Sequence, residues 1–308
     1  MTAKSSLELY QRRIKVKKNL FQGNEVLQRD LNTIREWAQK WKMEFNVDKC
    51  KIMHIGRTNP KQSYNMGGTN LTVTTEEKDL GVLVDDELEF DKHIRAIVNK
   101  ANRMLGMIRR GFTCLDKEIF LNLYPVLVRP LLEYCVQVWS PYKQMHIDLI
   151  EGVQKRATRL VPGTKNMDYD QRLAYLKDLP KLEERRVRGD MIETYKILTG
   201  KEDTKWDRFF QFAPTRGDQD LAHGLKLFPK RHRLDKRKYV FSHRVIRKWN
   251  ELSKEEVQSA KTSGFKEKYD KNEKDRKKLI SENAFTSGVR NYILRVFRPI
   301  LPPRGQVA

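Results

Sequence analysis

Helical spacing of apolar residues is the feature that most constrains how this chain can fold. From residue 90 to about residue 271, nearly every stretch has this spacing, and the stretches are separated by Pro or Gly. The pattern predicts helices near residues 91–112, 116–139, 145–161, 168–176, 181–199 and 239–252. Residues 266–278 mix Lys, Arg, Glu and Asp without aliphatic anchors, which indicates a solvated helix or a linker.

The first part of the chain has a different character. An amphipathic helix is predicted at residues 25–43 by apolar side chains at helical spacing, namely Leu27, Leu31, Ile34, Trp37, Ala38 and Trp41. Residues 50–56 alternate like a strand, residues 65–70 carry turn signals, and residues 71–84 indicate two further strands. The predicted fold class is therefore mainly α with a small α+β N-terminal unit.

Charge is the clearest guide to a binding partner. The 308 residues contain 62 Lys and Arg against 40 Asp and Glu, which gives a formal net charge of +22. Cations that neutralise phosphates release counterions, so this excess favours RNA or DNA of any sequence. A ribosomal-type or merely soluble basic protein fits the composition as well.

Other features argue against a metal centre and a membrane span. Of the three cysteines, only Cys50 has a histidine close by, His54, whereas a zinc site needs about four ligands. The N-terminus shows no secretory apolar region, and Arg129, Pro130 and Glu133 interrupt the most apolar stretch. We expect a soluble nuclear or cytoplasmic protein with no resident metal, no membrane contact and no small-molecule substrate.

Eight sequence blocks occur in a familiar order. They are LQRDLNTIREWAQKWKMEFNVDKCKIMHIG (27–56), KDLGVLVDDELEFDKHI (78–94), KANRMLG (100–106), LVRPLLEYCVQVWSP (127–141), VQKRATRLVPG (153–163), LEERRVRGDMIETYKILTG (182–200), TRG (215–217) and FSHRVIRKWNELS (241–253). Together they resemble the region that follows the catalytic turn in reverse transcriptases of jockey-like non-LTR retrotransposons. The resemblance covers about residues 26–272, and it weakens at LSKEEV and KDLPKLEERR.

The resemblance implies a division of the chain. Residues 25–89 would be a palm-edge remnant with a hairpin, residues 90–200 a thumb-like helical bundle, and residues 201–275 a basic, helical C-terminal domain. An unmatched basic leader at residues 1–24 and an unmatched tail at residues 276–308 complete the chain. RNA-directed DNA polymerase activity, with Mg²⁺ as its cofactor, would belong to the complete family enzyme.

The resemblance also implies that the catalytic carboxylates precede the matched region. Polymerases use metal ions held by carboxylates on facing palm strands, and only the unmatched leader stands where that turn is expected. We therefore expect a truncated RNA-directed DNA polymerase that retains nucleic-acid binding. One alternative is a host protein that reuses this basic region as a nucleic-acid or protein-interaction module without enzymatic activity. Another is a decayed reading frame with no selected role.

Three residues are weak catalytic candidates. Asp85 and Asp86 follow a predicted strand directly, as metal-binding Asp pairs often do, although a solvated strand end is the simpler interpretation. Lys49 matches a family lysine proposed to protonate the departing pyrophosphate, although a surface lysine is the simpler interpretation here.

Three basic regions are the candidate nucleic-acid contacts. In residues 92–110 the cations lie opposite the apolar stripe, and a second cationic face follows in residues 150–160. Residues 226–248 form the densest basic run, with aromatic residues that suit either base stacking or core packing. The candidates are Lys92, Arg103, Arg110, Arg156, Arg159, Lys230, Arg231, Arg233, Arg237 and Lys238. Ordinary solvated faces are the alternative.

Overall fold

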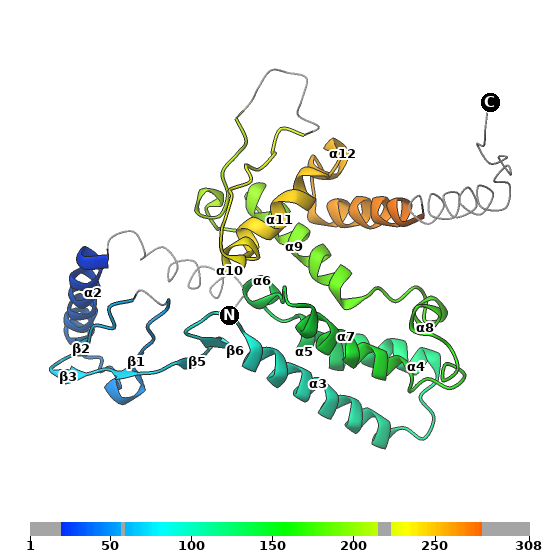
Figure 1. The fold of residues 1–308 in the computed structure, drawn as a ribbon, viewed down its shortest axis with the longest axis horizontal. Coiled ribbons are helices and arrows are strands. Elements are labelled where there is room, and N and C mark those ends of the chain that lie inside the picture. The colour runs from blue at the N-terminus through cyan, green and yellow to red at the C-terminus, as the bar shows by residue number, and fades with distance from the viewer. Residues whose placement is uncertain (1–19, 57–58, 215–222, 279–308) are drawn as a thin grey trace, which may run out of the picture. The chain divides into compact units, whose positions relative to one another are not determined.

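The structure is a computed structural model that describes residues 20–56, 59–214 and 223–278, and these residues are mostly helical (Figure 1). They fall into two compact units. One comprises residues up to Met191 together with residues 229–247, and the other comprises residues 192–228 together with those from Lys248 onward. Within the described residues, no helix is long and apolar enough to cross a membrane.

The first unit begins with helix α2 (Leu20–Lys40), a short 3-10 turn η2 (Val47–Lys49) and four two-residue strands. The strands are β1 (Lys51–Ile52), β2 (Asn65–Met66), β3 (Thr69–Asn70) and β4 (Thr72–Val73). β1 pairs with β4 in parallel, and β2 pairs with β3 in an antiparallel hairpin. Gly67 and Gly68 form the turn of this hairpin with φ values of 68° and 86°, a conformation that glycine adopts without strain.

Helix α2 packs on this hairpin along one edge of its apolar stripe. Leu27 and Leu31 contact a small core of Tyr64, Met66 and Leu71. The amide nitrogen of Gln28 donates to the carbonyl of Asn65 at 2.9 Å, so the helix also has a polar tie to β2. Ala38 is also buried, whereas Ile34, Trp37 and Trp41 of the predicted stripe are exposed.

A second hairpin leads into the helical bundle. Strands β5 (Glu76–Asp79) and β6 (Val82–Asp85) pair antiparallel, and Val82 and Val84 alternate onto the buried face. The backbone N–H of Leu83 donates to the Nδ1 atom of His93, a buried residue in the first turns of helix α3 (Asp91–Gly111). Burial lowers the pKa of His93 to about 4, so the ring is neutral at pH 7 and able to accept this bond.

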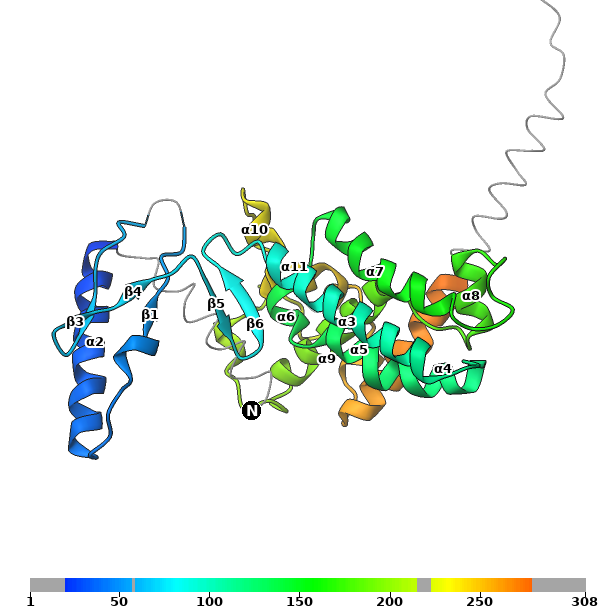
Figure 2. The same ribbon diagram turned by 90° about the horizontal axis from the view of Figure 1, so that it is seen from below.

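The bundle is built on α3, which packs against α5 and α7 (Figures 1 and 2). Its elements are α4 (Lys117–Leu123), η3 (Tyr124–Val128), α5 (Arg129–Glu133), α6 (Val136–Trp139), α7 (Gln144–Thr158), α8 (Tyr169–Tyr175) and α9 (Leu182–Leu198), the last of which crosses into the second unit. Ile94, Ile150, Val153 and Ala157 are fully buried in its core. Each helix predicted between residues 91 and 199 is present, with one exception.

That exception is the predicted single helix at residues 116–139, which is broken into four elements. Pro125 and Pro130 lack the N–H that an α-helix requires, and the chain between them forms the π-turn η3. At the end of α5, Tyr134 is extended and Cys135 has a φ of 56°, which reverses the backbone before α6.

Two helices follow in the basic run, α10 (Asp235–Lys238) and α11 (Phe241–Asn250), and α11 continues into the second unit. The second unit also contains η4 (Trp206–Arg208), α12 (Lys254–Val257) and a helix at residues 262–278. Its core stacks Phe265 on Tyr195 at 4.4 Å between ring centroids. The expectation of a solvated helix or linker at residues 266–278 holds only in part, because Phe265 and the buried Tyr269 anchor this helix one turn apart.

Candidate nucleic-acid interface

Helix α3 presents a cationic face that its own packing fixes in place. The predicted apolar stripe is confirmed, since Ile94, Val98, Ala101, Leu105 and Ile108 are buried. Arg103 and Arg110 lie on the opposite side of the helix and are exposed. Among the described residues, neither has an acidic partner. Their guanidinium groups are therefore free to meet a phosphate without first breaking an ion pair.

Lys92 belongs to the same face but is in a different state. Its ammonium group forms an ion pair with the carboxylate of Glu76 on β5, although 65% of the side chain is exposed. The neighbouring carboxylate raises the pKa of Lys92, which keeps it charged. A phosphate would have to compete with Glu76 for this lysine, so Lys92 is a weaker candidate than Arg103 and Arg110.

Helix α7 brings one of its two predicted arginines to the edge of α3. The side chain of Arg156 donates to Oδ1 of Asn102 on α3, through Nη2 at 3.0 Å and Nε at 3.2 Å. Arg159, the C-cap residue of α7, is exposed. Burial lowers the pKa of Arg172, and the nearby charge of Arg159 lowers it further. The structure thus joins Arg156 to the α3 face and gives Arg159 a separate position.

The basic run in residues 229–247 divides into exposed and structural cations. All five predicted contacts are exposed, namely Lys230, Arg231, Arg233, Arg237 and Lys238. By contrast, Arg244 forms a bidentate ion pair with the buried carboxylate of Asp190, at 2.8 and 2.9 Å. Lys236 forms ion pairs with Glu87 at 3.3 Å and with Glu89 at 3.0 Å. These two residues hold the run in place, a role that their position in a basic stretch does not reveal.

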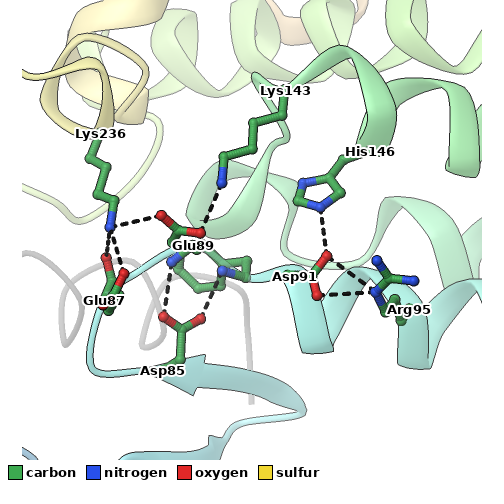
Figure 3. A network of polar contacts seen from close by, with 9 residues as sticks. Asp85, Glu87, Glu89, Asp91, Arg95, Lys143, His146 and Lys236 are labelled. Carbon is green, nitrogen blue, oxygen red and sulfur yellow. Dashed lines mark hydrogen bonds and ion pairs between the residues drawn. The ribbon is translucent and has the colours of Figure 1, made fainter.

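The carboxylate of Asp85 is used in a local turn (Figure 3), and the backbone N–H of Asp86 donates to the carbonyl of Thr75 at 2.9 Å. Asp85 accepts backbone hydrogen bonds on both carboxylate oxygens, from Glu89 at 3.0 Å and from Phe90 at 2.8 Å. These bonds close the turn that precedes α3, in which Leu88 and Phe90 both have φ values of 58°. The described residues contain no group of three or more His, Cys, Asp or Glu side chains that could hold a metal ion.

Ion pairs around this turn connect the start of α3 to the start of α7 (Figure 3). Glu89 pairs with Lys143 at 2.8 Å, and this lysine is the main cause of the lowered pKa of Glu89. Asp91 contacts His146 at 2.7 Å and Arg95 at 3.0 Å, and Arg95 is the main cause of its lowered pKa. Only the Asp91 and Arg95 pair, four residues apart on one helix, carries a signal that sequence reading can detect.

Lys49 and the Cys50–His54 stretch lie in the N-terminal unit. Lys49 ends η2 with its side chain exposed, and its backbone N–H donates to the side chain of Asn46 at 3.3 Å. The thiol of Cys50 donates to the carbonyl of Asn46 at 3.4 Å. These contacts describe a capped surface turn.

The fold and its charged faces define a basic, mostly helical protein whose cations lie on the outside of a packed bundle. No protein-family model matches the chain, and no solved structure matches it. It is 28% identical over 152 residues to the RNA-directed DNA polymerase from mobile element jockey of Drosophila funebris, an alignment that covers 47% of this chain and 16% of that protein. The corresponding polymerase of Drosophila melanogaster is 25% identical over 173 residues, with 52% of this chain and 19% of that protein covered.

A third relative is uncharacterized protein B0403.1 of Caenorhabditis elegans. It is 29% identical over 134 residues, which are 42% of this chain and 67% of that protein. Over about half of its length, the chain is related to the RNA-directed DNA polymerases of jockey and other non-LTR retrotransposons, as the sequence blocks predict. The aligned region spans less than a fifth of the length of the two jockey polymerases.

Proposed function

We propose that this chain corresponds to the palm edge, thumb and C-terminal helices of a reverse transcriptase and binds RNA or DNA through the phosphate backbone. In this assignment the β5–β6 hairpin belongs to the palm edge, and the bundle built on α3 is the thumb. The two jockey relatives are named as RNA-directed DNA polymerases, whose template and product are nucleic acids.

The proposal depends on one observation: Arg103 and Arg110 on α3 are exposed and, among the described residues, have no acidic partner. A helix whose other side is buried from Ile94 to Ile108 fixes the backbone that carries these two arginines. A rigid row of unpaired cations suits a regular backbone such as that of a duplex, and phosphate contacts of this kind position a protein without reading bases. The excess of +22 adds a long-range attraction for the same partner.

We further propose that the described residues bind without catalysing nucleotide transfer. Two-metal catalysis needs several carboxylates free to face one ion. Both oxygens of Asp85 accept backbone hydrogen bonds instead, and Lys49 ends an exposed turn that Asn46 caps. The complete family enzyme would use Mg²⁺ held by residues other than these.

The test compares cations of the α3 face that differ in their partners. In Arg103→Gln with Arg110→Gln, two unpaired charges are lost, and the salt slope of binding to a labelled RNA–DNA hybrid should fall by about two units. In Lys92→Gln the slope should fall by less than one unit, because Glu76 already neutralises part of that charge. Fluorescence anisotropy between 50 and 200 mM KCl measures both slopes.

A charge-matched control separates position from net charge. Lys205→Gln with Lys254→Gln removes two exposed lysines from the second unit and should leave the slope within about half a unit of the parent. If this control lowers the slope as much as the arginine pair does, binding depends on net charge alone. The assignment of α3 as the binding face would then be wrong.

A further inference from the structure

Two histidines in the basic run lie side by side. The ring centroids of His232 and His243 are 4.0 Å apart. His243 lies in the first turn of α11, and His232 precedes α10. The Nε2 atom of His232 and the Nδ1 atom of His243 are buried, and within the described part of the chain neither finds a partner. A buried polar atom left unsatisfied costs about 1–3 kcal/mol, so this arrangement favours a ligand that satisfies both rings.

The surroundings of the pair determine the charge of that ligand. The charged and titratable groups that act on His243 are His232, Lys230 and Arg237, all of them bases. Burial, assisted by these bases, lowers the pKa of His243 to about 4. A cation entering here would meet two positive side chains, whereas an anion would be attracted by them and accept N–H bonds from the imidazoles.

A transition-metal ion is the other ligand that two imidazoles suggest. Such a site needs three or four protein ligands, and the described residues contain no group of three candidate metal-binding side chains. The neighbouring Lys230 and Arg237 would repel the ion further. An oxyanion fits both the charge and the hydrogen-bonding capacity of the cluster.

We propose that His232 and His243, together with Lys230 and Arg237, form a seat for one phosphate group of bound nucleic acid, and that the imidazole pair takes up a proton when the phosphate enters. This inference rests on the proposed function and names one contact within it. The phosphate supplies the negative charge that the buried rings lack, so the protonated form of the pair is more stable in the complex than in the free protein.

Proton uptake has a defined sign and a measurable size. Because the bound state holds more protons than the free state, the affinity must rise as the pH falls. If the phosphate restores the pKa of His243 to its ordinary value of about 6.5, the affinity should increase about five- to tenfold between pH 7.0 and pH 5.5. Single-stranded RNA of 20 nucleotides, at constant ionic strength and with EDTA present, is the probe.

The variants His232→Gln and His243→Gln should lose most of this pH dependence. His54→Gln, in the N-terminal unit, is the matched control and should keep the full dependence. Lys230→Gln with Arg237→Gln changes only exposed side chains, so it tests the seat without disturbing the fold. This double variant should bind more weakly at both pH values.

A spectroscopic readout tests the same contact independently of affinity. In protein labelled at histidine with ¹³C, the His243 ring should titrate near pH 4 alone and at least one pH unit higher with the RNA bound. If the parent does not bind RNA at either pH, the proposed function fails. If the parent binds but its pH dependence survives in both histidine variants, or the His243 titration does not move, the phosphate seat is wrong while the proposed function stands. A requirement for added Zn²⁺ would also overturn the seat.

Discussion

The helical bundle built on α3 buries its large apolar residues, whereas the α2 unit, which comprises α2 and strands β1–β4, leaves similar residues exposed. In the bundle, Trp139 is buried to 1% exposure against α3, where its ring meets that of His93 edge to face at 5.2 Å. Trp37 on α2 and Trp41, the residue that follows its last turn, remain 54% and 62% exposed. Both tryptophans have the helical spacing of a core stripe. An amphipathic pattern therefore specifies that a helix forms, but it does not specify which element packs on the apolar face.

The strands reinforce this contrast. Parallel strands are normally covered on both faces, and a two-stranded pair has little stability alone. β1 and β4 form a parallel pair of two residues each, beside a core of three buried side chains. The bundle, by comparison, buries its main helix along the whole apolar stripe. We therefore expect the bundle to be the rigid platform and the α2 unit to open locally at a lower free energy.

Truncating one tryptophan in each region tests whether the two side chains differ in their contribution to stability. Trp139→Ala should lower the free energy of unfolding by about 3–5 kcal/mol, because it leaves a cavity in a packed core. Trp37→Ala should change it by no more than about 0.5 kcal/mol. Urea unfolding followed by circular dichroism gives both values. Equal losses would mean that the α2 face is covered as fully as the bundle core.

A smaller effect is expected at the junction between the two regions. Asp85→Ala removes the carboxylate that accepts two backbone N–H bonds in the turn before α3 and should cost about 1–2 kcal/mol. Asp86→Ala is the matched control and should be close to neutral, because the hydrogen bond from its backbone N–H to the carbonyl of Thr75 survives the change. Thermal unfolding of the two variants, compared with the parent, measures the difference. A larger loss in Asp86→Ala would contradict the capping role of Asp85.

Sequence reading predicted the parts of this fold that depend on local spacing. The α3 stripe follows from a periodicity of 3.6 residues, and it places Arg103 and Arg110 on the exposed side without any knowledge of tertiary structure. The breaks near Pro125 and Pro130 were equally local, yet the predicted helix at residues 116–139 ignored them.

The missed features depend on contacts between distant residues. The partner of Lys92 is Glu76, whose position follows from the register of the β5–β6 hairpin. Lys236 meets Glu87 and Glu89 across about 150 residues of sequence, so no local pattern in the basic run indicates these ion pairs. The net charge counts every lysine and arginine equally, whereas the structure shows which of them form ion pairs with acidic side chains.

A rigid, basic bundle that binds the phosphate backbone must displace counterions, so its binding must weaken as the salt concentration rises. The salt dependence of nucleic-acid binding by the parent chain is therefore the most direct measurement. If about six phosphates are neutralised, the affinity for a labelled RNA–DNA hybrid should fall roughly a thousandfold between 50 and 200 mM KCl, with little dependence on base sequence. An affinity that stays constant across this range, or that varies with base sequence more than with salt, would contradict the account.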